Sequence, residues 1–207
     1  MKTLLITGFD AFNLDKINPS SLAVKNLADQ INNIKVIKKI LPTKFKLASK
    51  KLDEYISHYN PDYVICVGQA AGRSKISLER VGLNLMDSTI SDNSNYMPKD
   101  EIIHKDGDLA YLSNLSLKDL LKALKDEGIS SEISYSAGTF VCNSVLYHLL
   151  YLIHKKQVKI QAGFIHIPLI ASQLNENNQD LPTMDLEEII KGLTIVINNL
   201  WVNNGII

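Results

Sequence analysis

The stretch SAGTFVCNS occupies residues 136–144 and joins a short predicted strand to a predicted helix over residues 140–156. Small residues open the stretch, apolar residues follow, and Cys142 falls in the first turn of the helix. Unpartnered backbone N–H groups and the positive end of the helix dipole favour an anion there, so we expect the thiolate of Cys142 to be stabilised. Because a single cysteine at a helix start is more often a small buried residue, its role depends on the rest of the chain.

Strand-like and helical patterns alternate on both sides of this stretch. Short apolar runs that end at glycine or proline predict strands over residues 4–7, 63–67 and 161–167. Helices are predicted over residues 45–58, 117–126 and 184–198. Another helix should start at Asn18 and Pro19 and place four apolar residues on one face: Val24, Leu27, Ala28 and Ile31. The alternation predicts an α/β fold with a largely parallel sheet, in a single domain over residues 1–207.

Charge and composition narrow the classes of partner. The 207 residues carry 22 basic and 22 acidic side chains, a formal net charge of zero, whereas binding to nucleic acid or an anionic membrane needs basic excess. No window is long and apolar enough for a membrane span, and the N-terminus does not have the pattern of a signal peptide. The two cysteines make no disulfide scaffold, so we expect a cytoplasmic protein that contacts neither nucleic acid nor membrane.

Phosphate and zinc sites are weakly indicated. The sequence GQAAGR at residues 68–73 follows a predicted strand, but its glycines do not have the spacing of a dinucleotide-binding loop. His148 and His154 are six positions apart, so they do not share a helix face and are expected to be packing or surface residues. We therefore expect no nucleotide, metal or other cofactor.

Two further residues complete a possible catalytic set with Cys142. His166 lies at the end of the strand predicted over residues 161–167, where sites assemble in parallel sheets, although a histidine there can also be a core residue. Glu79 lies in the long segment 68–110, where it could instead form a surface ion pair with Arg80. A thiol, an imidazole and a carboxylate are the parts of a Cys-His-acid triad, and backbone N–H groups at the helix start could hold an oxyanion.

Six separated motifs resemble those of one peptidase family. They are GFDAF at 8–12, NPS at 18–20, VGQAAGR at 67–73, LERV at 78–81, AGTFVCN at 137–143 and GFIHIP at 163–168. In this order they resemble pyroglutamyl-peptidase I, the pyrrolidone-carboxylate peptidase family of cysteine peptidases. The resemblance covers nearly the whole chain.

The resemblance implies a single α/β/α sandwich domain and an omega exopeptidase that removes an N-terminal pyroglutamyl residue from peptides. It implies catalytic roles for Glu79, Cys142 and His166, with an acyl-enzyme intermediate. The residues implied in substrate binding are Phe9, Phe12, Gln69, Phe140 and Val141. The resemblance implies no cofactor and no metal, and it suggests a homotetramer.

One position departs from the family pattern near the nucleophile. Thr89 stands where the family usually has an arginine that is thought to help the oxyanion. Losing one such donor typically costs about 100- to 1000-fold in rate. Two alternatives therefore stay open: a homologue that binds pyroglutamyl groups without turnover, and a related cysteine amidase that acts on another small lactam or amide.

Overall fold

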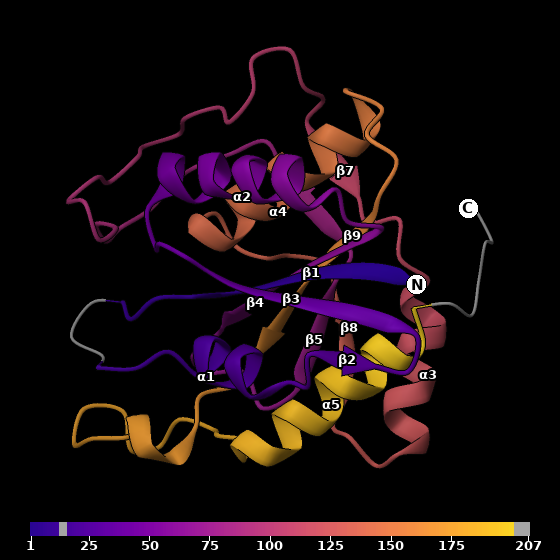
Figure 1. The fold of residues 1–207 in the computed structure, drawn as a ribbon. Coiled ribbons are helices and arrows are strands. Elements are labelled where there is room, and N and C mark those ends of the chain that lie inside the picture. The colour runs from indigo at the N-terminus through magenta and orange to yellow at the C-terminus, as the bar shows by residue number, and fades with distance from the viewer. Residues whose placement is uncertain (13–15, 201–207) are drawn as a thin grey trace.

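The computed structural model describes residues 1–12 and 16–200 and has an α/β/α architecture (Figure 1). Within these residues, a central sheet of seven strands has the order β2-β3-β1-β4-β9-β5-β8. The strands are β1 (Lys2–Phe9), β2 (Gln30–Ile31), β3 (Ile34–Leu41), β4 (Tyr63–Gln69), β5 (Ile76–Glu79), β8 (Ser131–Ser134) and β9 (Gln161–Ile167). Neighbouring strands are parallel except for the pairs β2–β3 and β5–β9, so the sheet is largely parallel, as predicted.

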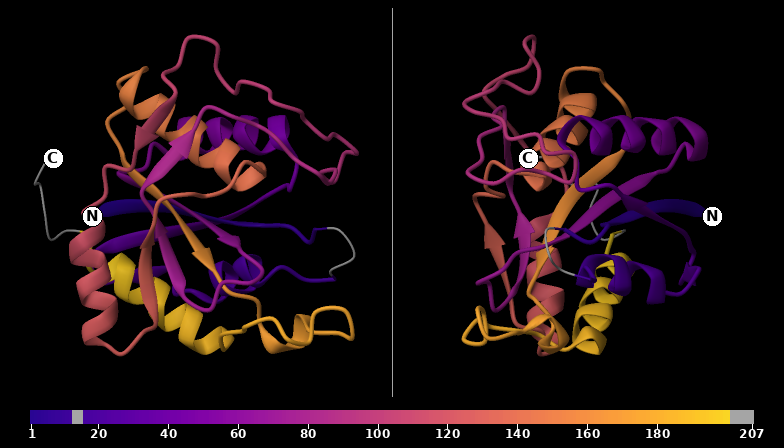
Figure 2. Two further views of the ribbon diagram at one scale, coloured as in Figure 1. Left: turned by 180° about the vertical axis from the view of Figure 1, so that it is seen from behind. Right: turned by 90° about the vertical axis from the view of Figure 1, so that its left-hand side faces the viewer.

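Helices cover both faces of this sheet (Figures 1 and 2). One layer contains α2 (Phe45–Tyr59) and α4 (Val141–His154), and the other contains α1 (Pro19–Asn26), α3 (Leu117–Asp126) and α5 (Leu186–Asn198). Successive side chains of a strand point to opposite faces, so Leu5 enters the core beneath α2 and α4, while Leu4 and Ile6 enter the core against α1 and α5. This double covering explains why the central strands are apolar throughout.

The long segment after β5 forms an outer layer over α2 and α4 (Figure 2). It begins with β6 (Val81–Leu83), which pairs antiparallel with β7 (Ala110–Leu112). Between these strands, Asp92 supplies the N-terminal cap that α2 lacks on its own, because its Oδ2 accepts a hydrogen bond of 3.0 Å from the backbone N of Phe45. The segment is thus attached to the helix layer that carries Cys142.

The predicted elements match the structure best where a proline or glycine ends them, such as Pro168 after β9 and Gly128 after α3. Strand β9 and helix α3 have the predicted bounds. The helix after Asn18 was predicted too long, because it ends at Asn26 and Ile31 lies in β2. A turn with Asn32 at φ 49° pairs Ile31 with Ile34, and this hairpin replaces the further helical turn.

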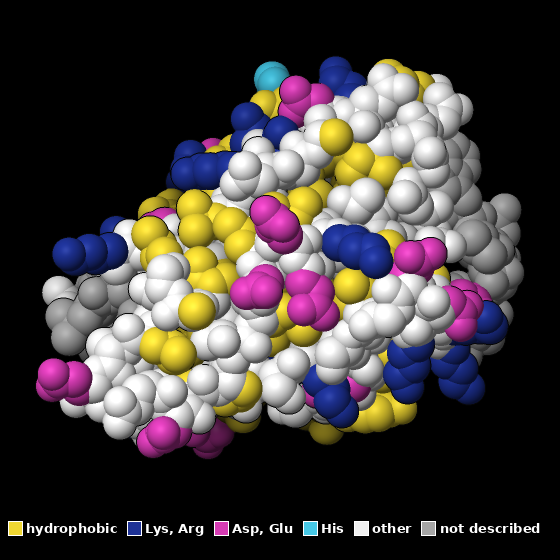
Figure 3. All heavy atoms as spheres, turned by 90° about the horizontal axis from the view of Figure 1, so that it is seen from below, with side chains coloured by type: hydrophobic (Ala, Val, Ile, Leu, Met, Phe, Trp, Pro, Cys, Tyr) yellow, Lys and Arg dark blue, Asp and Glu magenta, His cyan; other side chains and the backbone are white. Residues whose placement is uncertain are grey.

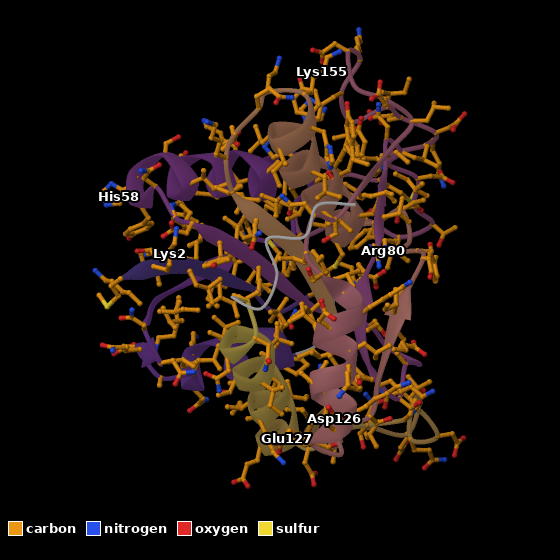
Figure 4. All side chains as sticks on the ribbon, turned by 90° about the vertical axis from the view of Figure 1, so that its right-hand side faces the viewer. Lys2, His58, Arg80, Asp126, Glu127 and Lys155 are labelled. Atoms are coloured by element: carbon orange, nitrogen blue, oxygen red, sulfur yellow. The ribbon has the colours of Figure 1, made fainter. Side chains whose placement is uncertain are left out.

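The charged side chains labelled in Figure 4 lie at different outer parts of the fold. Lys2 begins β1, Lys155 follows α4, and Asp126 and Glu127 lie at the end of α3.

Among the described residues, no helix has both the length and the apolar character needed to cross a membrane.

Candidate active site

Cys142 is the second residue of α4, and Phe140 precedes the helix in an extended conformation. Its sulfur lies against the bare backbone of Gly68 in β4: a Cβ on Gly68 would be 3.0 Å from Cys142 Sγ and 2.8 Å from Phe164 Cζ. Real Cβ atoms hardly ever approach other atoms to 2.8 Å. Glycine at position 68 therefore leaves the space that the thiol and the Phe164 ring occupy.

His166 lies beside the same glycine. Gly68 of β4 is its partner in the parallel register with β9, and the ring centroids of Phe164 and His166 are 4.8 Å apart. Phe164 and His166 are two positions apart on β9, so both side chains point to the α4 side of the sheet. The thiol, the Phe164 ring and the imidazole are thus gathered at the carboxyl ends of β4 and β9, where ligands bind in parallel sheets.

Glu79 completes this group from the neighbouring strand β5. Its Oε1 accepts a hydrogen bond of 2.7 Å from Nδ1 of His166 and a hydrogen bond of 2.6 Å from Nη1 of Arg73. The Glu79 side chain has no exposed surface, and its ion-pair partner is Arg73 instead of the adjacent Arg80. The alternative of a surface ion pair with Arg80 is therefore wrong.

A tight turn after β4 places Arg73. The Arg73 N–H donates to the carbonyl of Ala70 at 3.2 Å, and Gly72 has φ +86°. A glycine at the third position with positive φ is typical of a type II turn. A Cβ on Gly72 would meet nothing within 4 Å, so this glycine is required by its backbone conformation and not by space.

The electrostatics of Cys142 differ from the sequence-based expectation. Burial, together with the negative charge of Glu79 and the neighbouring Cys66, raises the pKa of its thiol to about 12. Arg73 and the backbone N–H of Cys142 itself act in the opposite direction. The helix start therefore does not outweigh burial, and the resting side chain is a neutral thiol.

The other two groups have lowered pKa values. Burial lowers the pKa of His166, although its hydrogen bond with Glu79 opposes this effect. Burial opposes the ionisation of Glu79, but the hydrogen bond and charge of His166, with smaller effects of Ser134 and Arg73, leave its pKa lowered. The hydroxyl of Ser134 donates to the carbonyl of Ser136 and accepts from the backbone N–H of Ser136. Near neutral pH the site thus holds a thiol, a neutral imidazole and a carboxylate.

Aromatic rings pack together next to the start of α4. The ring of Phe140, next to the start of α4, lies 5.1 Å from that of Phe12 and 5.0 Å from that of Phe45, measured between centroids. Phe12 and Phe140 are partly exposed, whereas Phe9 is 2% exposed and Val141 is fully buried. Phe12 and Phe140 therefore offer an apolar surface, and Phe9 and Val141 pack behind it.

The chain is similar to known proteins of one family along almost its whole length. The family model described as pyroglutamyl peptidase matches residues 1–202. The chain belongs to the pyroglutamyl peptidase family. A pyrrolidone-carboxylate peptidase of Thermosipho melanesiensis is 50% identical over 197 residues, which are 95% of this chain and 97% of that protein. Another, from Clostridium perfringens, is 44% identical over 202 residues, 98% of this chain and 94% of that protein.

The fold agrees with solved pyroglutamyl peptidases as well. The crystal structure of pyroglutamyl peptidase I from Bacillus amyloliquefaciens has a TM-score of 0.93 and 38% sequence identity, and the match covers 98% of this chain and 96% of that one. The pyrrolidone carboxyl peptidase from Thermococcus litoralis has a TM-score of 0.92 and 36% identity, covering 97% and 93% of the two chains. The family assignment and the α/β/α fold predicted from the motifs are confirmed.

Within this pyroglutamyl peptidase fold, the first two motifs support each other. Asn18 caps α1 through its Oδ1, which accepts from Ser20 N, and its Nδ2 donates to the carbonyl of Asp10 at 3.0 Å. Ser20 Oγ in turn accepts from Phe9 N at 2.9 Å. The NPS motif thereby fixes the backbone that leads to Phe12, a role that sequence reasoning did not assign.

Further side chains that position the site were also missed. Gln173 Nε2 donates to Gln69 Oε1 at 3.0 Å, so a residue from the loop after β9 orients Gln69. Asn143, next to Cys142, accepts from Leu83 N and donates to the carbonyls of Leu83 and Leu85, each at 2.9 Å. The only sequence signal for these roles was the position of Asn143 within the AGTFVCN motif.

The segment that carries Thr89 contacts the residues just before Cys142. Thr139 Oγ1 donates to the carbonyl of Asp87 at 2.6 Å, and Asp87 N donates to the carbonyl of Thr139 at 3.2 Å. Thr89 itself is exposed. Lys99 Nζ donates to the carbonyl of Ser88 at 2.7 Å, so a cation is present next to this position even without an arginine at 89.

Proposed function

We propose that the chain is a cysteine exopeptidase that removes an N-terminal pyroglutamyl residue from peptides through Cys142, His166 and Glu79. The observation that carries this proposal is the position of Cys142 Sγ, at the start of α4 and beside the glycine that pairs with His166. The names of the relatives, pyrrolidone-carboxylate and pyroglutamyl peptidase, supply the substrate class.

The hydrogen bond between His166 and Glu79 assigns the proton on the imidazole. Because Glu79 is a carboxylate, Nδ1 of His166 carries the hydrogen that it donates, and Nε2 holds the free electron pair. Nε2 is therefore the base that accepts the proton of the Cys142 thiol while Sγ attacks the pyroglutamyl carbonyl. Because the thiol has a raised pKa, Nε2 has to take its proton for Sγ to act as a nucleophile.

The second half of the reaction uses the same imidazole. The imidazolium of His166 gives its proton to the leaving amine, and a thioester of Cys142 with the pyroglutamyl group remains. Water then loses a proton to Nε2 and attacks the thioester, which releases pyroglutamate and the thiol. In both steps, backbone N–H groups in the first turn of α4, including that of Cys142, face the developing oxyanion.

The substrate itself is a neutral lactam ring without an ammonium group. Such a ring needs apolar walls and a few hydrogen bonds, not a carboxylate that pairs with a charged N-terminus. We assign Phe12 and Phe140 to the walls, Phe9 and Val141 to the packing behind them, and Gln69 to the lactam amide. A site that bonds the lactam should reject prolyl substrates, which lack the ring carbonyl, by several orders of magnitude.

A fluorogenic assay tests this function. Wild type should release coumarin from a pyroglutamyl conjugate and not from the prolyl conjugate, and Cys142→Ser should lose the activity. Cys66→Ala is the matched control, because Cys66 is the other free cysteine and is fully buried in β4. Equal activity of wild type and Cys142→Ser would exclude Cys142 as the nucleophile. Binding of 2-pyrrolidone in a thermal-shift assay without any turnover would favour the homologue that only binds.

Assembly and location extend the proposal. We infer a cytoplasmic homotetramer. The assembly is supported by the zero net charge, which gives little colloidal repulsion, and by exposed apolar side chains such as Leu109 and Tyr135. The location is supported by the two free cysteines. Hydrophobic side chains also gather in patches between charges of both signs on the face shown in Figure 3. Light scattering coupled to gel filtration measures the number of subunits, and cell fractionation measures the location. A monomer, or a protein outside the cytoplasm, would contradict these two inferences.

A further inference from the structure

One oxygen of Glu79 accepts two hydrogen bonds from different parts of the chain. Oε1 accepts a hydrogen bond from Nδ1 of His166 at 2.7 Å and another from Nη1 of Arg73 at 2.6 Å. The other oxygen, Oε2, is buried, and no donor among the described residues reaches it with hydrogen-bonding geometry. The orientation of this carboxylate therefore depends on Arg73 as well as on His166.

The second arm of the Arg73 guanidinium contacts the chain that leads to the nucleophile. Nη2 donates to the carbonyl of Ser136 at 2.8 Å, six residues before Cys142. Arg73 thus connects the loop after β4, the end of β5 and the segment before α4. Only a planar fork with several N–H groups can make both contacts at once, because a lysine ammonium is a single point of charge.

We propose that Arg73 is a positioning residue that sets the orientation of Glu79 toward His166 and offsets the charge of Glu79 beside Cys142. This inference rests on the proposed function, because it assigns Arg73 a part in the same triad. Arg73 acts through Glu79, so it is not itself a catalytic residue.

The charges that face the site support this role. The charge of Glu79 on β5 raises the pKa of the His166 imidazole, and the charge of Arg73 lowers it. The pKa of the Cys142 thiol is raised by Glu79 and by Cys66 on β4, and it is again lowered by Arg73. Without Arg73, the Glu79 carboxylate would be unopposed. The imidazole would then hold a proton at higher pH, and the thiol would lose its proton less readily.

The test compares the pH dependence of kcat/KM for three variants. In Arg73→Met we expect the acid limb to move to higher pH by about one unit, with kcat lowered about 10-fold or more and KM little changed. In Arg73→Lys the charge remains, so the acid limb should stay near that of wild type, while kcat falls because the lysine cannot reach both Glu79 and Ser136. Arg80→Met removes an equal charge next to Glu79 and should match wild type (Arg80 is labelled in Figure 4).

Several outcomes would overturn the proposal. An acid limb that stays in place in Arg73→Met would do so, as would a rise in KM alone or an equal shift in Arg80→Met. The His166 imidazole is also titrated by NMR in wild type and Arg73→Met, because this readout needs no turnover. A higher pKa in Arg73→Met is expected, and an unchanged pKa contradicts the role of Arg73. If wild type shows no turnover but the NMR shift is present, the proposed function fails and the role of Arg73 stands.

Discussion

His166 Nδ1 lies 2.7 Å from Glu79 Oε1, although 87 positions separate the two residues in the chain. Glu79 ends β5 and His166 lies near the end of β9, and these two strands are antiparallel neighbours in an otherwise mostly parallel sheet. The reversed direction of β5 brings the carboxylate to the imidazole from inside the sheet. Both side chains are consequently almost fully buried, and their orientation is fixed before any substrate binds.

The raised pKa of the Cys142 thiol predicts a characteristic pH dependence of alkylation. Because the pKa of Cys142 is raised to about 12, the thiolate fraction is small at neutral pH and increases as the pH rises toward that value. The rate of inactivation by iodoacetamide should therefore climb about tenfold per pH unit from pH 7 to pH 10. A rate that is already constant above pH 5 would indicate a stable thiolate and contradict the neutral resting state. A Cys66→Ala background ensures that Cys142 is the residue modified.

Adding a methyl group at position 68 should remove activity. In Gly68→Ala the new Cβ would lie 3.0 Å from Cys142 Sγ and 2.8 Å from Phe164 Cζ, so the thiol or the ring must move. A displacement of this size next to the reacting atom should lower kcat/KM about 100-fold or more, as measured in the pyroglutamyl assay.

Gly192→Ala is the matched control for this substitution. Its Cβ would approach Ile76 Cδ1 to 2.5 Å, but on the α5 side of the sheet, away from Cys142. We expect kcat/KM of Gly192→Ala to stay within a factor of two of wild type, about 0.4 kcal/mol, even if its melting temperature changes. Similar activity losses in both variants would mean that the space beside the thiol is not critical.

Asn143 should contribute strongly to stability. Its side chain is fully buried and satisfies Leu83 N together with the carbonyls of Leu83 and Leu85. Asn143→Ala leaves these partly buried backbone groups without their side-chain partner, which should lower the free energy of unfolding by about 2–4 kcal/mol in urea titrations. Asn26→Ala removes one exposed hydrogen bond to Leu22 and should cost less than about 0.5 kcal/mol. Comparable losses in the two variants would refute the role of Asn143.

A hydrogen-bonded pair of histidines, His104 and His148, predicts that the protein loses stability in acid. His104 Nε2 and His148 Nδ1 share a hydrogen bond of 2.8 Å, and His148 Nε2 contacts Asp53 Oδ1 at 2.8 Å. Burial, and then the charge of His148, lower the pKa of His104 below its ordinary value of 6.5. The unfolded chain therefore binds this proton more readily than the folded chain, so stability is present above pH 6.5 and decreases as the pH falls below it.

Melting temperatures between pH 8 and pH 5 measure this contribution. The decrease toward acid pH should be shallower in His104→Gln than in wild type, because the group that resists protonation is gone. His58→Gln is the control, since His58 is an exposed histidine near the end of α2 whose ring packs edge-on against Tyr59 (His58 is labelled in Figure 4). If wild type and His104→Gln have parallel curves, another group causes the acid sensitivity.

The sequence predicted those features that depend on local pattern. Strand β9 and helix α3 follow from an apolar run ended by Pro168 and from apolar spacing followed by Gly128, which has φ +76°. The position of Cys142 in the first turn of α4 followed in the same way. The helix predicted through Ile31 was wrong because a two-residue turn outweighed the helical period, and only pairing with β3 reveals that turn.

Features that depend on contacts between distant segments could not be predicted. The partner of Glu79 is Arg73, six positions earlier, and not the adjacent Arg80, because the turn at Gly72 brings Arg73 back over the end of β5. The pKa of Cys142 was expected to be low from the helix start alone, whereas burial against Gly68 and Phe164 raises it. Burial of this kind is a property of the packed fold, and no local pattern records it.

Detection of a covalent intermediate on Cys142 tests the proposed mechanism most directly. Wild type is mixed with a pyroglutamyl ester or amide substrate, quenched in acid within milliseconds, and analysed by intact-mass and peptide mass spectrometry. We expect a transient mass increase of one pyroglutamyl acyl group on the peptide that contains Cys142. This adduct should be absent in Cys142→Ala and should form far more slowly in His166→Ala, which lacks the base that takes the thiol proton. Hydrolysis that proceeds at full rate in Cys142→Ala, or an acyl group found on another residue, would contradict it.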